Sequence, residues 1–340
     1  MSLEIPRSFS SGIPRVLVPP FPRMAKRILV TGSLAYDLLL NYDGSFTQSL
    51  RPDSLESLSV SFFCSHFARH RGGTGVNVAW NLKLLKRDAL LVAAVGYDGD
   101  EYLDILKKRS IATEHVERID DAVTATAVIG SDSSERQIAF FHPGADARST
   151  WPDLKEERED IAYAIVGARD PHQMMRAVEW CFEQKIPVLF DPGQQTIAFG
   201  PDELKRLFKM STVVIVNDYE WKTLCRTLKC DEESVLRYVP TLVATHGGEG
   251  FTVYSKKGVR GVRACASKGV VNPTGAGDAF RAGVLTGLSA GWELLDACKL
   301  GAAMGSFNVE YEGTLLDSLD VPAVFARAKE AYGEALPELR

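Results

Sequence analysis

The sequence predicts an α/β protein built on a doubly wound, mainly parallel sheet, with helices on both faces and a small β-sheet lid. Segments with helical periodicity separate several short, apolar, β-branched runs. Uninterrupted apolar strands that alternate with helices are typical of a parallel sheet buried on both faces. The runs are 27–32, 90–96, 161–167, 186–191, 213–217 and 241–245, and the helical segments include 75–86, 99–109 and 171–184.

Two stretches interrupt this alternation and predict the lid. Residues 38–70 contain the runs LLLNY and LSVSFF, and residues 122–142 contain AVTATAVIG and QIAFF on either side of the polar segment SDSSER. The second pattern is typical of a β-hairpin, because polar turn residues separate two β-rich runs. Neither stretch is followed promptly by a crossover helix, so we expect the two to form a small separate sheet.

The two ends of the chain differ in character. Residues 1–25 are rich in Pro and Ser, and we expect them to be a flexible tail outside the fold. Residues 26–340 are expected to form one domain that includes the lid. Beyond Gly258 the pattern predicts a mainly helical segment, with helices at 275–290, 292–309 and 321–333.

Composition and charge exclude several classes of protein. The 340 residues are 45% apolar and 24% charged, which is typical of a globular protein with a sizeable core. The net charge of -5 argues against a nucleic-acid partner, and no apolar run approaches the roughly 18 residues of a membrane span. The six cysteines are scattered without a C-x-x-C pair, so we expect neither structural zinc nor disulfides, and a cytoplasmic location.

Polar residues follow five of the predicted strands, where ligands bind in open parallel sheets. Any one such residue is more often a helix cap or a turn residue than part of a site. Five polar strand ends together predict a polar cleft. The residues are Gly32, Ser33 and Asp37; Gly96 and Asp98; Asp191, Gln194 and Gln195; Asn217 and Glu220; and Thr245, Gly247 and Gly250.

The segment NPTGAGDAF, residues 272–280, is the most informative in the chain. Thr274 is expected to cap a helix whose first residues are Gly275, Ala276 and Gly277. Glycine costs roughly 1 kcal/mol relative to alanine inside a helix, so two glycines in one first turn need a compensating reason. Unpaired amides at a helix start attract anions, and close approach by a phosphate supplies that reason.

Asp278 follows in the same first turn, and two interpretations of it stay open. The residue is either an acid that interacts favourably with the helix dipole or the general base of a reaction at the bound phosphate. Its spacing from Thr274 does not fit a capping box, and a carboxylate beside a phosphate needs a chemical task. Arg281, one turn later, is either a surface residue or a partner that keeps Asp278 ionised.

The chain resembles the ribokinase/phosphofructokinase-B family of carbohydrate and nucleoside kinases, from Lys26 to about Leu316. Both signatures of that family are present, as RGGTGVNVAWNL at residues 71–82 and NPTGAGDAFRAG at 272–283. The resemblance implies a ribokinase-like sheet with a β lid over the acceptor site. It also implies transfer of a phosphoryl group from ATP, with Mg²⁺, to an alcohol group of a nucleoside or sugar.

The resemblance assigns roles to the residues that match the family's motifs. Asp278 is similar to the family's catalytic base, and the amides of Gly275, Ala276 and Gly277 are similar to its anion hole. The residues that would hold hydroxyls of the acceptor are Asp37, Gly72, Gly73 and Asn77. Those that would bind ATP are Asn217, Glu220, Thr245, Gly247 and Gly250, of which Glu220 would act on magnesium indirectly, through water.

Within the family, the chain looks most like bacterial adenosine kinases. The similar segments are GSLAYD at 32–37, SVSFF at 59–63, QIAFFHPGA at 137–145, DPGQQ at 191–195 and the Arg in GDAFRAG. By this resemblance Ser33 would join the ribose site, Gln195 would approach the base and Phe141 would stack on a purine. Conversion of adenosine to AMP, as in purine salvage, is therefore the first expectation.

Two departures from the family pattern leave parts of this expectation open. Asn272 stands where many members carry an Asp that helps to bind an activating monovalent cation, so such a cation is possible but not favoured. Ala127 stands where the similar kinases place a second aromatic wall. Inosine, guanosine, cytidine or a sugar such as ribose are alternative acceptors, a binding protein without catalysis is a further alternative, and a homodimer formed through the lid is possible.

Overall fold

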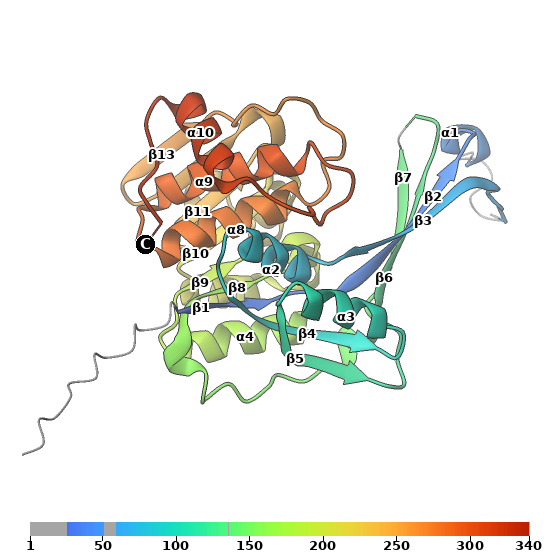
Figure 1. Cartoon of the computed structure of the whole chain (residues 1–340), viewed down its shortest axis with the longest axis horizontal. Helices are drawn as coiled ribbons and strands as arrows, with labels where there is room; N and C mark the ends of the chain where they lie inside the picture. The colour runs from blue at the N-terminus through green and yellow to red at the C-terminus, as the bar shows by residue number, and fades with distance from the viewer. Residues whose placement is uncertain (1–25, 51–58, 135, 340) are drawn as a thin grey trace, which may run out of the picture.

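The computed structural model describes residues 26–50, 59–134 and 136–339, and its central element is a nine-stranded sheet (Figure 1). The strand order is β13-β12-β11-β10-β9-β8-β1-β4-β5. The strands from β11 to β5 are parallel, and β12 and β13 add an antiparallel edge. These strands are β1 (Arg27–Thr31), β4 (Ala89–Gly96), β5 (Ala112–Ile119), β8 (Ile161–Val166), β9 (Val188–Phe190), β10 (Val213–Asn217), β11 (Thr241–Thr245), β12 (Phe251–Ser255) and β13 (Gly258–Val262).

Helices cover both faces of this sheet because successive apolar side chains of each strand point to opposite faces. Ile28 and Val30 of β1 belong to the core shared with α2, α3, α8 and α9, whereas Leu29 belongs to the core shared with α4, α5 and α6. The predicted doubly wound fold is therefore confirmed. The helices are α1 (Phe46–Ser49), α2 (Thr74–Leu84), α3 (Asp100–Lys108), α4 (Pro171–Glu183), α5 (Pro201–Met210), α6 (Asp218–Leu228), α7 (Glu232–Val235), α8 (Ala276–Ser289), α9 (Leu294–Asn308) and α10 (Val321–Tyr332).

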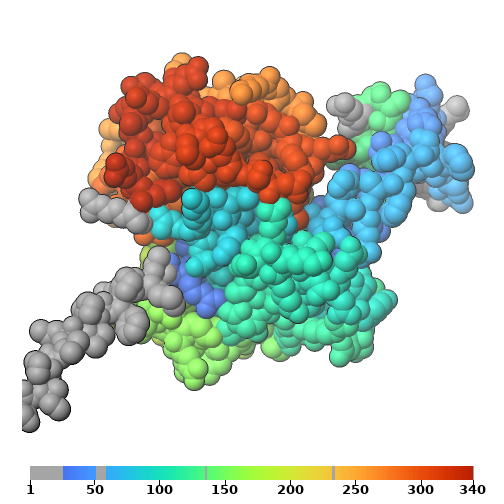
Figure 2. All heavy atoms as spheres, viewed as in Figure 1, coloured from blue at the N-terminus to red at the C-terminus, as the bar shows by residue number. Residues whose placement is uncertain are grey.

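A second sheet of four strands projects from one end of the main body, and we call it the lid sheet (Figures 1 and 2). Its strand order is β3-β2-β6-β7, with β2 (Ala35–Tyr42), β3 (Cys64–Gly72), β6 (Ala125–Ser131) and β7 (Gln137–His142). β6 and β7 form the predicted hairpin, while β2 pairs antiparallel with β3 and parallel with β6. The predicted small sheet is therefore confirmed.

One strand prediction was wrong, and three strands of the main sheet, β5, β12 and β13, were not predicted. The run LSVSFF is not a strand over its described residues 59–63, and β3 begins after it, at Cys64. β5 was not predicted because, as an edge strand, it carries charged side chains on a pattern without a continuous apolar run. β13 lies in the segment predicted to be mainly helical, and its sequence GVRGV is exposed at the far edge of the sheet.

The last layer of the fold depends on close packing between α8 and α9. A Cβ at Gly283 would lie 2.6 Å from the Cα of Gly301, and a Cβ at Gly287 would lie 2.7 Å from the Cβ of Ala297. Glycine is therefore required where the two helices touch. This contact fixes the start of α8 relative to the sheet.

Some predictions concern parts of the chain that the structure does not describe. The expected flexible tail, residues 1–25, lies outside the described residues, as do residues 51–58 between β2 and β3. Among the residues that are described, no helix is both long and apolar enough to span a membrane. None of the six cysteines, all of which lie within the described residues, forms a disulfide.

Candidate active site

The start of α8 faces the carboxyl ends of the parallel strands, and its geometry follows from two glycines. The helix begins at Ala276, one residue later than predicted, and Gly275 is its N-cap with a φ of 84°. A Cβ at Gly275 would also lie 3.0 Å from the Cβ of Thr314, so space and backbone conformation both require glycine. Thr274, the predicted cap, makes no side-chain cap bond.

The amides of this first turn differ in their hydrogen bonding. The Ala276 N–H donates to the Pro273 carbonyl at 3.3 Å, a weak turn contact. Within residues 26–50, 59–134 and 136–339, the N–H groups of Gly275 and Gly277 have no protein acceptor. Unpaired amides at the start of a 14-residue helix can bind an anion.

Asp278 accepts a hydrogen bond from the Nδ2 atom of Asn77 at 2.7 Å. Loss of hydration raises the pKa of the Asp278 carboxyl to about 6, and the charges of Asp191 and Asp37 act in the same direction. Arg281 and the Asn77 hydrogen bond oppose this rise. The carboxyl is therefore ionised at neutral pH, yet its pKa is close enough to neutrality for it to accept a proton.

Arg281 is buried and does not lie on the surface. Its Nη2 atom donates to Asp191 Oδ1 at 2.8 Å, its Nε atom pairs with the other oxygen of the same carboxylate, and its Nη1 atom donates to the Gly277 carbonyl at 3.0 Å. Asp191 follows β9, so this ion pair joins the start of α8 to the end of a neighbouring strand.

The predicted acceptor residues gather between the lid sheet and α2. A Cβ at Gly72 would overlap the Oδ2 atom of Asp37, and a Cβ at Gly73, which has a φ of 95°, would lie 2.5 Å from the Ser33 carbonyl. Gly72 therefore lets the backbone pass beside the Asp37 carboxyl, and Gly73 lets it pass close to the backbone of Ser33. Burial raises the pKa of Asp37, and His70 opposes the rise.

Several candidate residues are paired side by side across the four strands of the lid sheet, and we call this line of paired residues a row. Asp37 of β2 is paired with His70 of β3 on one side and with Ala127 of β6 on the other, and Ala127 is paired with Phe141 of β7. Residues paired across strands point to the same face. Phe141 and Asp37 therefore share the face that also approaches Asp278, since Asp37 influences the pKa of Asp278.

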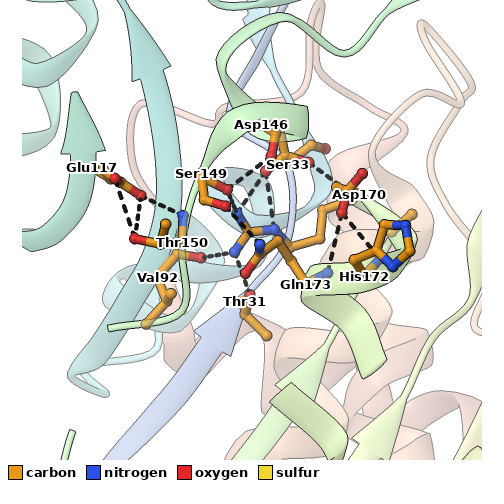
Figure 3. Close-up of polar contacts among 12 residues, drawn as sticks. Thr31, Ser33, Val92, Glu117, Asp146, Ser149, Thr150, Asp170, His172 and Gln173 are labelled. Atoms are coloured by element: carbon orange, nitrogen blue, oxygen red, sulfur yellow. Dashed lines mark hydrogen bonds and ion pairs between the residues drawn. The ribbon is translucent and has the colours of Figure 1, made fainter. Parts of the chain in front are cut away.

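Ser33 is held at the junction between β1 and the lid sheet. Its hydroxyl accepts the Thr74 N–H at 3.2 Å, and its own N–H donates to the Ala168 carbonyl at 3.0 Å. Next to it, a buried ion pair joins Arg169 to Asp146, which follows β7 in the 3₁₀ helix Gly144–Arg148. Figure 3 shows the polar contacts around Thr31, Ser33, Asp146 and Ser149 that fix this junction.

Asn217 and Glu220 form a reciprocal capping box at the start of α6. The Glu220 N–H donates to Asn217 Oδ1 at 2.9 Å, and Glu220 Oε2 accepts the Asn217 N–H at 2.8 Å. Burial raises the pKa of Glu220, Asp191 acts in the same direction, and Arg281 opposes the rise. The two residues therefore have a structural role, and the second Glu220 oxygen stays available for another partner.

The predicted nucleotide-binding loop is a tight turn between β11 and β12. Gly247 and Gly250 have φ values of 55° and 118°, and the His246 N–H donates to the Gly250 carbonyl at 2.8 Å. The Thr245 hydroxyl contacts the Val216 carbonyl at 3.4 Å. His246 also hydrogen-bonds Asp218 at 2.6 Å, so the loop is attached to the start of α6.

Magnesium would be held by these residues indirectly, through water. Among the described residues, no group of three or more His, Cys, Asp or Glu side chains could hold a metal ion directly. A single carboxylate oxygen at Glu220 fits contact through water. At the predicted cation position, Asn272 Oδ1 accepts the Thr274 N–H at 2.9 Å and so already has a protein partner.

The structure therefore brings Asp278, Asn77 and Asp37 together and places Phe141 on the same side of the lid sheet. Gln195 lies in the 3₁₀ helix Gly193–Ala198 after β9, and within the described part of the chain its side chain makes no hydrogen bond to these residues. Asp191 was predicted only as one of the polar strand ends of the cleft, without a role of its own. His70 was not predicted, because nothing in the sequence pattern singled it out.

Comparison with known proteins agrees with this geometry. Residues 25–321 match the model of the pfkB family carbohydrate kinases. A nucleoside kinase of Methanothermobacter thermautotrophicus is 28% identical over 309 residues, which cover 88% of this chain and 98% of that protein. A ribokinase of Lactococcus lactis is 25% identical over 313 residues, which cover 89% and 97% of the two chains.

Solved structures show the same fold. The structure of Burkholderia thailandensis nucleoside kinase in complex with inosine superimposes with a TM-score of 0.80 at 30% sequence identity, and the match covers 92% of this chain and 100% of that one. The family match extends over most of the chain, from the first strand to the start of α10. The protein therefore belongs to the pfkB family of carbohydrate kinases, which are phosphotransferases that act on hydroxyl groups, and it has the ribokinase-like fold.

Proposed function

We propose that the protein transfers the γ-phosphoryl group of ATP to the 5′-hydroxyl of a ribonucleoside, with adenosine, which would give AMP, as the first candidate. The observation that carries the proposal is the position of the Asp278 carboxyl. It lies in the anion-binding first turn of α8, is hydrogen-bonded by Asn77, and is close to Asp37 on the face of the lid sheet that also carries Phe141.

The reaction needs a base, an anion site and a way to hold the acceptor. Asp278 accepts the proton of the attacking hydroxyl, and the free amides of Gly275 and Gly277 stabilise the negative charge on the transferred phosphoryl group. Asp37 accepts hydrogen bonds from sugar hydroxyls, Gly72 leaves room beside its carboxylate, and Gly73 lets the chain pass close to Ser33. Asn77 keeps an unpaired Oδ1 atom within the described residues, which can accept one more hydroxyl.

Glu220 and Asn217 lie on the nucleotide side, where the fit to magnesium is through water. When bound, magnesium supplies positive charge that offsets the charge of the ATP phosphates. The Asn217–Glu220 capping box fixes the position of the one carboxylate oxygen that is left for such a contact. The loop from Thr245 to Gly250 follows the neighbouring strand and would bind the rest of the nucleotide.

An exposed aromatic ring on the site face favours a nucleoside over a free sugar. Phe141 offers stacking area for a flat base, and a sugar has no comparable surface. Ala127 lies directly beside Phe141 in the row and provides no second ring. The preferred base is therefore the finer question, and the inosine complex of the Burkholderia relative makes inosine a strong competitor to adenosine.

The test is an ATP-consumption assay with adenosine, inosine, guanosine, cytidine and ribose as separate acceptors. We expect a kcat/KM for at least one purine nucleoside that is far above the value for ribose. Asp278→Asn should lower kcat by roughly 10²–10⁴-fold with little change in KM. Ribose as the best acceptor would replace the nucleoside proposal with a sugar kinase, and near-normal turnover by Asp278→Asn would contradict the assignment of the base.

We also propose that a second copy of the chain covers the back of the lid sheet. This face carries Leu40, Val128 and Phe140, which line a pocket of about 610 Å³ together with Phe46 and Phe62. Apolar side chains in one exposed groove are unfavourable in a monomer. Ile138 of β7 also lines this pocket. Light scattering should give a dimer mass for the wild type and a monomer mass for Ile138→Glu, and a wild-type monomer at micromolar concentration would contradict this proposal.

A further inference from the structure

Arg281 is buried among acidic groups at the start of α8, with 6% of its surface exposed. Its charge faces Asp278 on its own helix, Asp191 after β9 and Glu220 on α6. A buried ion pair gives little net stability, because the two groups lose their hydration. Stability alone is therefore a weak explanation for an arginine at this position.

The guanidinium also shapes the first turn of the helix. Its Nη1 atom donates to the Gly277 carbonyl at 3.0 Å, and a Cβ at Gly277 would lie 2.9 Å from the same nitrogen. Gly277 is thus the residue over which Arg281 packs. Gly277 therefore has two roles. Its N–H is free to bind an anion, and its lack of a Cβ leaves room for the Arg281 guanidinium.

The bonds to Asp191 prevent Arg281 from turning away. Nη2 donates a hydrogen bond to Asp191 Oδ1 and Nε forms an ion-pair contact with Oδ2, so the Asp191 carboxylate and the Gly277 carbonyl together fix the plane of the guanidinium. One side chain thus connects the end of β9 to the turn that carries the predicted anion site and base. Asp278 is only three residues away, so it lies on the same face of α8.

We propose that Arg281 is a positioning residue for phosphoryl transfer, which holds the first turn of α8 in place through Gly277 and keeps Asp278 ionised by its fixed positive charge. This inference rests on the proposed function, because it concerns the same base. Arg281 acts through Gly277 and Asp278 and needs no contact with substrate.

The charges around Asp278 make the test directional. The groups that influence its carboxyl are Arg281, which lowers its pKa, and Asp191 and Asp37, which raise it. Removal of the positive charge in Arg281→Met should move the acidic limb of the kcat–pH profile to higher pH. Removal of the negative charge in Asp191→Asn should move it to lower pH, while an amide oxygen still accepts a hydrogen bond from Arg281.

A neighbouring charge shifts the pKa of a carboxyl by roughly 1–3 units. At the low end of this range, each variant should move the pKa of Asp278 by about one unit. The measured quantity is the ratio of kcat at the acidic pH to kcat at pH 8.5 in the same protein. At pH 6 this ratio should be about fivefold lower in Arg281→Met than in the wild type. At pH 5 the same ratio should be about fivefold higher in Asp191→Asn. Arg281→Lys keeps the charge and should retain the wild-type midpoint, although it loses the paired contact with Asp191.

A matched pair of variants controls for damage to the fold. Arg169 and Asp146 form another buried ion pair, at the lid junction, and neither is among the main influences on the pKa of Asp278. Arg169→Met and Asp146→Asn should lower the thermal midpoint as strongly as the variants at Arg281 and Asp191, but should leave the acidic midpoint of kcat unchanged. A purely structural Arg281 would behave in the same way as this control pair.

The outcomes separate the inference from the function on which it rests. If the wild type phosphorylates no nucleoside, or if Asp278→Asn is active, the proposed function fails. If the wild type is active and Asp278→Asn is not, but Arg281→Met and Asp191→Asn fail to move the midpoint in opposite directions, only the role of Arg281 is overturned. Asp191→Asn alone decides the question if Arg281→Met does not fold.

Discussion

The Nδ2 atom of Asn77 donates a hydrogen bond of 2.7 Å to the carboxylate of Asp278, although the two residues are 201 positions apart in the chain. Asn77 comes from the first turn of α2, after the lid sheet, and Asp278 from the first turn of α8. The contact joins the two sequence signatures at one point. It also leaves the Asn77 Oδ1 atom, which is 4% exposed with its residue, without a partner among the described residues.

This contact predicts the effect of Asn77→Ala. The amide donates to the charged form of Asp278 and so lowers its pKa. Without it, we expect a lower kcat, by roughly 10–100-fold near pH 6, and a smaller deficit at pH 8.5, where the carboxyl is ionised in any case. Steady-state kinetics across this pH range would check the prediction, and a deficit that does not depend on pH would contradict it.

The wild-type enzyme should lose activity on acidification, with a midpoint set by Asp278. Burial raises the pKa of its carboxyl to about 6, and the protonated form cannot act as a base. We therefore expect kcat to be constant above about pH 7 and to fall tenfold per pH unit well below pH 6. A profile that stays flat down to pH 4.5 would show that another group accepts the proton.

The same carboxyl should make the folded state less stable at neutral pH. Its pKa is raised from 3.8 to about 6 on folding, so the folded state binds its proton more tightly than the unfolded state. The cost of holding it ionised is absent below about pH 4 and complete above about pH 6, where it is on the order of 2–3 kcal/mol at most.

Asp278→Asn should therefore raise the free energy of unfolding at pH 8 although it strongly lowers kcat. At pH 4 the two proteins should have similar stability. Denaturant unfolding at the two pH values measures this difference. Equal stability of the variant and the wild type at pH 8 would mean that the carboxyl is better solvated than its surroundings indicate.

Much of the fold follows from patterns within single segments, and the site only in part. The apolar runs of β1, β4 and β10 are buried on both faces, so their sequence reports their structure directly. β3 has the sequence CSHFARHRG and belongs to the projecting lid sheet. Its polar and apolar residues do not alternate in a way that indicates a buried face. Propensity alone does not identify such a strand, because its pairing with β2 decides its conformation.

The site residues divide in a similar way. Asp278 and Gly277 lie within a continuous motif whose chemistry can be argued from the sequence. Asp191 and His70 gain their positions from partners elsewhere in the chain, Arg281 and Asp37, through strand order and register. A pattern within one segment carries no information on such partners, which is why Arg281 could be offered as a partner of the base but the charges of Asp191 and Asp37 around it could not be predicted.

Gly72 should be intolerant of a side chain because of Asp37. A Cβ at this position would overlap the Asp37 Oδ2 atom, so Gly72→Ala must move the carboxylate that is proposed to hold the sugar. We expect KM for the nucleoside to rise by at least tenfold, with a smaller change in kcat. Gly261→Ala on β13 is the control, because its Cβ would meet only the Thr252 hydroxyl at 3.9 Å.

The two faces of the lid sheet predict different effects for two adjacent phenylalanines. Phe141 is 52% exposed and shares a row with Asp37, whereas Phe140 is 68% exposed and pairs with Val128 on the opposite face. Stacking of a base on an aromatic ring is worth about 1–3 kcal/mol by alanine substitution. Phe141→Ala should therefore raise KM for the nucleoside by about 5–150-fold, and leave KM for ATP nearly unchanged.

Phe140→Ala is the matched control, because it removes the same ring from the same strand but from the back of the sheet. We expect its KM for the nucleoside to stay within twofold of the wild type. Titration of each variant with the best nucleoside by calorimetry would give the same comparison without turnover. If Phe140→Ala weakens nucleoside binding as much as Phe141→Ala does, the ring of Phe141 is not a base platform, and the choice of a nucleoside over a sugar loses its structural support.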